Sequence, residues 1–407
     1  MIPKKDLRWY LFEETIEMYS KNGLNNYEKH RYKDLNRFLS DYYIFRLVGM
    51  TSKICYKLSK FYKKGDNQIL VHDLLNRYPS IINQLELNYN PIFFGNDIKP
   101  FIKSLKGKTN FYPFYDIYKE VYEGVLDYND SLLEKGFMDL ENILKEIDPK
   151  LIVLNHDFTT DTKLVSLVAK ELGIPTVEIQ HGIYSGKGTI VPGNYADYVF
   201  VWGEYFKNLY LASKIKQDRE IRILGYPYQL QQQKLSHYNK KVVYLGQNLE
   251  LYDDSFLNQK DNTINELNSL CSGLGLQFSY RPHPSQNLGL LKSVFPEVRF
   301  TPDGETFADT IKNNEIFISF NSTALIEAAL NSKLSIQLKN YSLPADDFEE
   351  LGICRSFTSL SELKEFLKDI KTLDDLKSLY SPVDPSYIEI PTPNSGEKFI
   401  ELIKEIL

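Results

Sequence analysis

The chain has 407 residues, 43% hydrophobic and 25% charged, which is ordinary for a globular protein and long enough for two domains. Its three cysteines, Cys55, Cys271 and Cys354, lie far apart, which excludes a disulfide framework or a cysteine-rich zinc site and predicts a reducing, cytoplasmic setting. The net charge is −6, and the sequence shows neither a signal peptide nor an apolar run of about 18 residues, so we expect neither export nor a membrane span.

The first 64 residues differ from the rest in charge. They carry 14 Lys/Arg and 7 Asp/Glu, a balance of +7, which leaves −13 for the remaining chain. Apolar residues recur there at three-to-four spacing, which predicts two or three helices. The aromatic residues of this segment are Trp9, Tyr10, Phe12, Tyr19, Tyr27, Tyr32, Phe38, Tyr42, Tyr43, Phe45, Tyr56, Phe61 and Tyr62. They are either the core of a helical subdomain, which we favour, or a peripheral contact with the inner face of an anionic membrane.

Strands and helices alternate from residue 91 onward. A first strand is expected at 91–95, a helix at 118–147, and then a strand at 151–154, a helix at 162–172 and a strand at 175–179, which form a parallel βαβ unit. Further strands are expected at 198–202, 221–224, 241–245, 276–280 and 316–320, and helices near 260–273, 323–330 and 395–407. This pattern predicts an α/β fold with two Rossmann-like domains.

The predicted boundaries follow from this alternation. A helical N-terminal region spans residues 1–90, and a first Rossmann-like domain for the acceptor spans 91–232. A second Rossmann-like domain for the donor spans 233–385, with the linker at 231–240. A C-terminal helix occupies 386–407. Nucleic-acid binding is disfavoured because the chain is acidic and carries no known binding motif.

The tetrapeptide Arg281-Pro282-His283-Pro284 directly follows a predicted strand. The two prolines fix the backbone on either side of His283 and present its imidazole on a stiff loop. An imidazole in that position can hydrogen-bond a phosphate or protonate a leaving oxygen, and Arg281 can add a bidentate contact. The alternative is a solvated turn histidine without a role.

The segment Asn321-Ser322-Thr323 lies between the strand 316–320 and the helix behind it, 38 residues after His283. Such side chains either cap the helix or leave its N–H groups facing an anion. Together with the His283 loop, the segment predicts a nucleotide-phosphate site on the second domain. The remaining predicted donor-binding residues are Ser319, Gly246, Gln247, Glu305 and Glu327, the two glutamates as candidate contacts to base or ribose.

Two polar tripeptides follow neighbouring strands of the first domain, Asn155-His156-Asp157 and Gln180-His181-Gly182. Because parallel strands end at the same edge of a sheet, Asp157 and His181 are expected in one cleft. Sugar transfer with inversion needs a base for the acceptor hydroxyl, and either side chain can serve. The alternative is ordinary loop polarity. Gly186-Lys187-Gly188 does not match a nucleotide P-loop.

These motifs together resemble surface-polysaccharide glycosyltransferases of the GT-B fold, related to the bacterial sialyl- and Kdo-transferases and to the CDP-glycerol transferases of teichoic-acid synthesis. The similar stretches are LGIPTVEIQHGI, ADYVFVWGE, ILGYP, RPHP and NSTALIEAAL, roughly between residues 151 and 337. Two departures from the sialyltransferase pattern stand out. A paired Ser-Ser appears as Asn321-Ser322-Thr323, and Asn155-His156-Asp157 replaces the acidic-acidic-Gly signature.

The resemblance implies a metal-independent, inverting glycosyltransferase without a cofactor. It implies a CMP-linked acidic sugar as donor, held at His283 and at Ser322 and Thr323, a glycan or lipid-linked acceptor, and Asp157 as the base. It also implies that the C-terminal helix packs back on the first domain. The open alternatives are a CDP-glycerol-type phosphotransferase with His181 as base, a UDP-sugar transferase, a nucleotide-sugar 2-epimerase and a non-catalytic assembly subunit.

Overall fold

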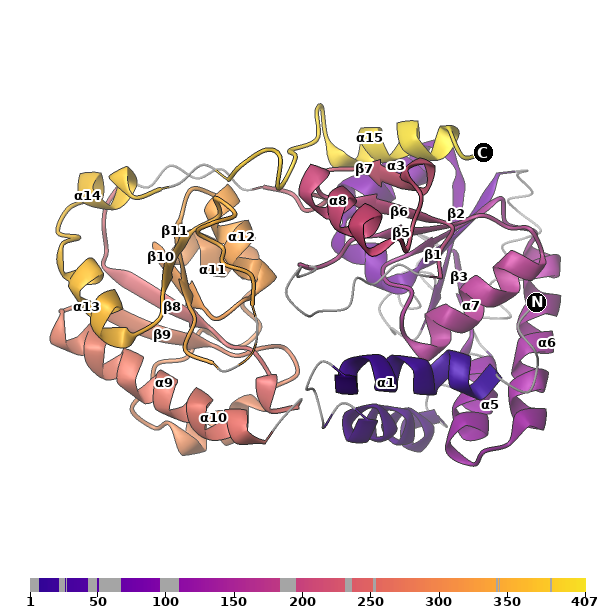
Figure 1. The fold of residues 1–407 in the computed structure, drawn as a ribbon, viewed down its shortest axis with the longest axis horizontal. Helices are drawn as coiled ribbons and strands as arrows, with labels where there is room; N and C mark the ends of the chain where they lie inside the picture. The colour runs from indigo at the N-terminus through magenta and orange to yellow at the C-terminus, as the bar shows by residue number, and fades with distance from the viewer. Residues whose placement is uncertain are drawn as a thin grey trace.

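The computed structural model of the protein describes residues 7–21, 26, 28–42, 50, 67–95, 110–183, 195–230, 236–251, 254–341, 343, 345–380 and 383–407. Two parallel sheets, each with helices packed around it, form two halves that lie side by side (Figure 1). This is the arrangement of two Rossmann-like domains that the alternation of strands and helices predicts.

The first domain is built on a seven-stranded sheet with the order β3-β2-β1-β4-β5-β6-β7, in which every neighbouring pair is parallel. Its strands are β1 (Gln68–His72), β2 (Asn90–Gly95), β3 (Asn110–Pro113), β4 (Leu151–Leu154), β5 (Thr176–Ile179), β6 (Tyr198–Val201) and β7 (Ile221–Ile223). Alternate residues of β1 enter two different cores, Leu70 one and Ile69 and Val71 the other. Burial on both faces explains why the strands read as continuous apolar runs.

Helices cover both faces of this sheet. They are α1 (Glu14–Lys21), α3 (Pro79–Asn88), α5 (Tyr115–Leu126), α6 (Asp130–Ile147), α7 (Thr160–Glu171) and α8 (Glu204–Ser213), with a π-helical turn η2 (Trp9–Glu13), 3-10 turns η3 (Asp73–Arg77) and η4 (Asp218–Glu220), and a helical segment at residues 28–42. The N-terminal helices lie against the same domain: Leu11, Phe12 and Leu35 are buried in its core.

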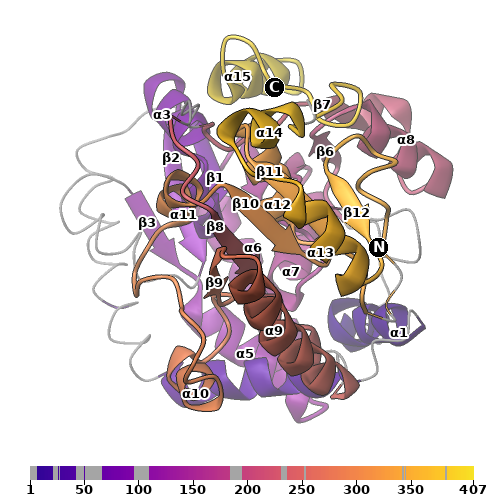
Figure 2. The ribbon, with the colours of Figure 1, turned by 90° about the vertical axis from the view of Figure 1, so that its left-hand side faces the viewer.

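The second domain has a five-stranded parallel sheet with the order β12-β11-β10-β8-β9. Its strands are β8 (Lys241–Leu245), β9 (Gln277–Arg281), β10 (Ile316–Ser319), β11 (Leu334–Leu338) and β12 (Arg355–Phe357). Its helices are α9 (Ser255–Gly273), α10 (Leu288–Val294), α11 (Phe307–Asn313), α12 (Thr323–Leu330), α13 (Leu360–Lys368) and α14 (Leu373–Ser378), with a 3-10 turn η5 (Leu249–Leu251). Figure 2 shows α9 and α13 on the outer face of this sheet, so α12 packs on the face toward the first domain.

The C-terminal segment returns to the first domain. Residues 383–394 run beside the ends of β6 and β7, where Glu389 N–H donates to Trp202 O at 2.8 Å and Glu389 O accepts from Tyr226 N–H at 2.8 Å. Helix α15 (Ser395–Lys404) then packs against α3, and Gly396 N–H donates to the Ser80 hydroxyl at 3.1 Å (Figure 1). Gly396 is needed there, because a Cβ would collide with the Ser80 carbonyl.

Three elements of the first domain differ from the sequence-based expectation. Strand β1 lies inside the region predicted to be helical, and β3 was not predicted. The predicted helix 118–147 is two helices, because the chain turns at Tyr128 with φ +54° and the Asn129 side chain caps α6 by accepting from Ser131 N–H at 3.1 Å.

The described part of the basic segment supports the core interpretation of its aromatic residues. Phe12 and Tyr42 are buried, and the Phe38 and Tyr122 rings meet edge to face at 5.0 Å. None of the described helices is both long enough and apolar enough to cross a bilayer. The predicted peripheral membrane contact stays a prediction, since Tyr27, Tyr43, Phe45, Tyr56, Phe61 and Tyr62 lie outside the described residues. Residues 231–235 of the predicted linker lie outside them as well.

Candidate functional site

Three neighbouring strands of the second domain end beside one another. Strand β8 lies between β9 and β10, with Leu245 paired to Arg281 and Tyr244 paired to Ile318. The loops after these strands carry Gln247, the His283 tetrapeptide and Asn321, so the fold gathers the two predicted donor motifs at one edge of the sheet. Open α/β sheets bind ligands at this edge.

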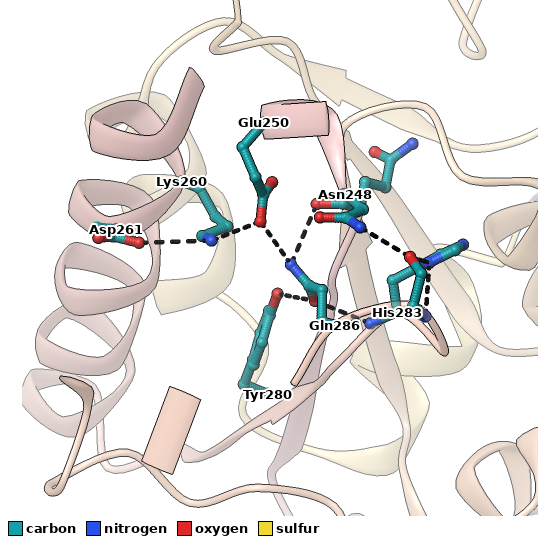
Figure 3. Close-up of polar contacts among 9 residues, drawn as sticks. Asn248, Glu250, Lys260, Asp261, Tyr280, His283 and Gln286 are labelled. Carbon is teal, nitrogen blue, oxygen red and sulfur yellow. Dashed lines mark hydrogen bonds and ion pairs between the residues drawn. The ribbon is translucent and has the colours of Figure 1, made fainter. Parts of the chain in front are cut away.

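Hydrogen bonds hold the His283 loop in a fixed conformation (Figure 3). Nδ1 of His283 lies 2.6 Å from the Ser285 hydroxyl, which also accepts from the Asn248 amide at 2.8 Å. The Gln286 side-chain oxygen accepts from His283 N–H and from the Tyr280 hydroxyl, both at 2.9 Å. The ring is exposed, and with Nδ1 engaged, Nε2 is the nitrogen that can meet a ligand.

A buried ion pair supports this loop from behind. The Gln286 amide donates to a carboxylate oxygen of Glu250 at 3.2 Å, and the same oxygen accepts from Lys260 of α9 at 2.7 Å (Figure 3). The Lys260 side chain is only 7% exposed. Gln286, Glu250 and Lys260 were not predicted from the sequence, and the one available signal is that Gln286 lies two residues after the tetrapeptide.

Gln247 connects the β8 end to the segment before α12. Its amide donates to the Asn321 side chain at 2.5 Å, and its side-chain oxygen accepts from Asn321 N–H at 3.1 Å. The Gln286 amide reaches Gln247 O at 3.5 Å, so a chain of contacts runs from His283 to Asn321. Gly246 fits this packing because a Cβ there would collide with the Tyr280 hydroxyl.

The hydroxyl residues around α12 have different surroundings. Ser322 is the N-cap, and its hydroxyl accepts from Ala324 N–H at 3.3 Å. Ser319, which was predicted to bind the donor, is fully buried and donates to Leu245 O at 2.9 Å, so its hydroxyl faces the sheet. Thr323 lies at the first turn of α12 and points toward the first domain, where its hydroxyl accepts from Ile183 N–H at 3.4 Å.

Arg281 is used within the second domain. Its guanidinium donates to Glu305 O at 3.2 Å from both terminal nitrogens and to the Thr310 hydroxyl at 2.6 Å. The Glu305 carboxylate accepts from the same hydroxyl at 2.7 Å. Arg281 and Glu305 therefore hold the start of α11 against β9. The bidentate contact of Arg281 is made with the backbone carbonyl of Glu305. The predicted phosphate contact of Arg281 and ligand contact of Glu305 stay predictions.

Glu327 lies on α12 at the boundary between the two domains. Burial raises the pKa of its carboxyl to about 7, although the Arg281 guanidinium works in the opposite direction. A carboxyl with such a pKa exchanges protons near neutrality and can both donate and accept a hydrogen bond to a ligand hydroxyl.

Three of the six histidines form a row along the first-domain sheet edge. His72 ends β1, and His156 and His181 follow the neighbouring strands β4 and β5. The ring centroids are 5.4 Å apart between His72 and His156 and 5.7 Å apart between His156 and His181. Burial lowers the pKa of His72 and His156 to about 4 and that of His181 to about 3. All three rings are neutral at pH 7 and can accept protons or hydrogen bonds.

Asp157 has a different position from the one expected of a base. It is fully buried, and one carboxylate oxygen accepts from the backbone N–H groups of Tyr195 and Ala196, both at 2.8 Å. These bonds fix the chain just before β6. The carboxylate is thus an anchor between two strand ends.

Residues of α7 that the sequence analysis missed surround the same edge. Asp161 lies in the first turn of α7 and is 8% exposed. Burial works against its ionisation, but the His156 and His72 rings and the Thr159 hydroxyl keep the pKa of Asp161 below its ordinary value. The fully buried Lys163 ammonium binds the Glu14 carboxylate at 2.9 Å and Tyr10 O at 2.8 Å, which ties the N-terminal helices to α7. A histidine that closes an apolar strand, as His72 does, is the one sequence signal that could have been noticed.

The two edges meet at the loop after His181. Ile183 N–H donates to the Thr323 hydroxyl of α12. Gly182 lies next to the same hydroxyl: a Cβ added to Gly182 would be 3.6 Å from the Thr323 oxygen. The Tyr228 hydroxyl donates to His181 O at 3.4 Å. The loop that begins at His181 therefore contacts the N-terminus of α12, whereas His72 lies at the far end of the row.

Comparison with solved structures shows the GT-B fold. A UDP-GlcNAc 2-epimerase from Neisseria meningitidis bound to UDP-GlcNAc has a TM-score of 0.58 at 14% identity, over 83% of this chain and 100% of that one. S. aureus MnaA in complex with UDP has the same TM-score and identity, over 84% and 96%. A variant of the wall teichoic acid polymerase TagF has a TM-score of 0.50 at 13% identity, over 92% and 98%. No protein-family profile matches the sequence, and no curated protein is significantly similar to it.

Proposed function

We propose that the protein is a glycosyltransferase that moves a sugar from a nucleotide-linked donor on the second domain to a saccharide acceptor on the first. The observation that carries this proposal is the chain of contacts from His283 through Gln286 and Gln247 to Asn321. It holds three strand-end loops around the N-terminus of α12, which faces His181 of the other domain through the contact between Ile183 and Thr323. A helix N-terminus and a fixed imidazole can stabilise a leaving phosphate, and a second imidazole on the other domain can act as the base.

The donor phosphate binds, in this proposal, between Nε2 of His283 and the first turn of α12. The free N–H groups of that turn and the helix dipole attract negative charge. His283 donates a hydrogen bond to the leaving phosphate oxygen as negative charge develops there. Glu327, one turn into α12, accepts a hydroxyl of the ribose. Because these are protein groups, the transfer needs no metal.

His181 serves as the base in this proposal. Its loop contacts Thr323 through Ile183 N–H, two residues after His181, whereas the Asp157 carboxylate is fully buried and already accepts two backbone hydrogen bonds. Burial keeps the His181 imidazole unprotonated at pH 7 but lowers its pKa to about 3, which makes it a weak base in the ligand-free protein. In this proposal the bound donor phosphate raises that pKa, so the imidazole takes the proton of the acceptor hydroxyl while that oxygen attacks the anomeric carbon from the face opposite the phosphate. The product is inverted at that carbon.

The nucleotide is the finer part of the proposal. The sequence resemblance favours CMP, and two structural neighbours hold UDP-GlcNAc and UDP. Thermal melting with CMP, CDP, UDP and GDP tests the choice: a pyrimidine nucleotide that binds at a hundredfold excess over its Kd adds about 2.7 kcal/mol of stability. His283→Ala is expected to remove most of this shift. Melting curves unchanged by all four nucleotides would contradict the proposal and favour a non-catalytic assembly subunit.

A nucleotide-sugar 2-epimerase is the second candidate, because two neighbours at a TM-score of 0.58 are proteins of that fold, one of them a named epimerase. At 14% identity the likeness shows the fold alone. Incubation with UDP-GlcNAc and no acceptor, followed by proton NMR of the anomeric signals, separates the two. Appearance of the 2-epimer favours this candidate, and an unchanged spectrum together with nucleotide binding favours the transferase.

A further inference from the structure

A cavity of about 380 Å³ opens at the far end of the histidine row in the first domain. The helical segment 28–42 forms one wall with Arg31, Asp34 and Phe38, and the strand-end side forms the other with His72, His156 and Asp161. Its volume lies in the range of small-molecule sites, about 300 to 1,000 Å³. The cavity therefore has room for one sugar ring.

Polar atoms in its wall lack partners. His72 is 3% exposed and lines the cavity, and its Nδ1 has no hydrogen-bond partner within the described part of the chain. Nδ1 of His156 is in the same situation. Buried polar atoms are nearly always hydrogen-bonded, so two unpaired acceptors or donors at a cavity wall indicate a ligand that supplies the missing bonds.

The charges around the cavity select against an anion. Among the lining residues that the structure describes, Asp34, Asp73 and Asp161 contribute three carboxylates, and Arg31, 3.7 Å from Asp34, is the cation. The histidines are neutral at pH 7 because burial lowers the pKa of His72 and His156 to about 4. A surplus of carboxylates repels a second anion and accepts hydrogen bonds from hydroxyl groups.

Two other classes of ligand fit less well. Among the described residues, no group of three or more His, Cys, Asp and Glu side chains is arranged to hold a metal ion. Phe38 and Tyr122 line the cavity with aromatic rings, which suit the C–H face of a sugar better than a small hydrated cation.

The position of the cavity connects it to the donor half. His72 and His156 line it, His181 is the next ring in the row at 5.7 Å, and the loop after His181 contacts Thr323 of α12. The cavity thus lies on the domain proposed for the acceptor, and the histidine row separates it from the loop that contacts α12.

We propose that this cavity binds an uncharged sugar ring of the acceptor, with Asp161 and His72 bonding its hydroxyls and Phe38 packing on its C–H face. The inference deepens the proposed function and rests on it for the word acceptor. Binding of the ring itself is a separate property of the cavity and can be measured without turnover.

Saturation-transfer NMR on the full chain tests it with single-ring probes. The neutral probes are the methyl glycosides of glucose, galactose, mannose and N-acetylglucosamine, and the anionic probe is methyl glucuronide. We expect at least one neutral glycoside to receive transfer, at least threefold more strongly than the anionic probe. No transfer to any neutral glycoside, or stronger transfer to the glucuronide, would overturn the proposal.

Variants locate the binding. Asp161→Asn and His72→Phe are expected to weaken the best neutral probe at least fivefold, and Phe38→Ala at least threefold. The matched controls are Asp130→Asn, which removes an exposed first-turn carboxylate from α6, and Leu39→Ala, which shortens the next residue of the helical segment without touching the cavity. Equal losses in variants and controls would place the probe elsewhere and overturn the proposal.

Nucleotide melting on the same samples separates this inference from the proposed function. The cavity variants are expected to keep the nucleotide-induced shift of the unsubstituted protein, which also shows that they are folded. Glycoside binding without any nucleotide shift would contradict the transferase and leave the sugar cavity standing. A nucleotide-induced shift without glycoside binding would contradict the sugar cavity and leave the proposed transferase standing.

Discussion

The two sheet edges that face each other satisfy their polar groups in opposite ways. At the second-domain edge, protein partners hold His283, Gln286, Gln247 and Asn321 before any ligand arrives. At the first-domain edge, buried imidazole nitrogens of His72 and His156 have no partner among the described residues. A sheet edge whose side chains are already held in place suits a constant part of the substrate, such as a phosphate. Buried polar atoms without partners instead lower the affinity for every ligand that lacks hydroxyls in the matching positions. In the proposed function, the second domain therefore provides affinity and the first domain selectivity.

The largest expected effect comes from removing the imidazole that lies between the two edges. His181→Gln is expected to lower kcat about 10²- to 10⁴-fold, because a glutamine cannot take the acceptor proton. Nucleotide binding should be unaffected, since the donor contacts lie on the other domain. Turnover is measured with the donor found by melting, and His237→Gln, an exposed histidine before β8, is the control. Retention of more than half of the turnover would show that the base is another group.

Asp157→Asn tests, through the free energy of unfolding, whether Asp157 is a structural residue and His181 the base. The substitution removes the charge that accepts from Tyr195 and Ala196 N–H, and we expect the free energy of unfolding to fall by about 2 kcal/mol. Urea unfolding measures it, and the exposed Asp303→Asn should change stability by less than about 0.5 kcal/mol. Unchanged stability together with abolished turnover would instead identify Asp157 as the base.

Glu327 makes the boundary between the domains sensitive to pH. Its pKa is raised from 4.5 to about 7 in the folded protein, so the folded state holds the proton more tightly and stability is lost as the pH rises from 4.5 to 7. Glu327→Gln should flatten this loss and stabilise the protein by about 2 kcal/mol at pH 8, with little effect at pH 4.5. Melting from pH 4.5 to 8 checks it, and parallel curves for both proteins would refute the burial of the carboxyl.

The smallest effect tests the preorganisation of the second-domain edge. Gln286→Leu removes the partner of His283 N–H, Tyr280 and Glu250 without touching the ring, and we expect nucleotide affinity to fall about tenfold. Isothermal titration measures the change, with Gln277→Leu at the exposed start of β9 as the control. An unchanged affinity would mean that the loop needs no support from Gln286.

Much of the fold could be predicted because parallel strands buried on both faces leave a plain pattern. Strands β4 and β8 and helix α12 begin and end where the apolar runs predict. Strand β1 could not be separated from the helices before it, because a run of five residues fits either period. The break between α5 and α6 contains neither glycine nor proline, so it gave no warning.

The site was only partly predictable for a different reason. Neighbouring strands end together, so the sequence was enough to expect His283 near Asn321 and Asp157 near His181. The direction in which a side chain points depends on tertiary packing. Arg281 turns to Glu305 and Thr310, Asp157 turns to the backbone before β6, and Asp161 becomes important only because His156 and His72 lie against it.

The return of the C-terminal segment has a mechanical consequence. Because residues 383–394 run back beside β6 and β7 and α15 docks on α3, the chain passes between the domains twice. A chain that joins two domains twice restricts twisting and sliding of one domain against the other more than a single connection does. We therefore expect a hinge motion, in which the strand ends of the two sheets move apart to admit substrates and then restore the contact between Ile183 and Thr323.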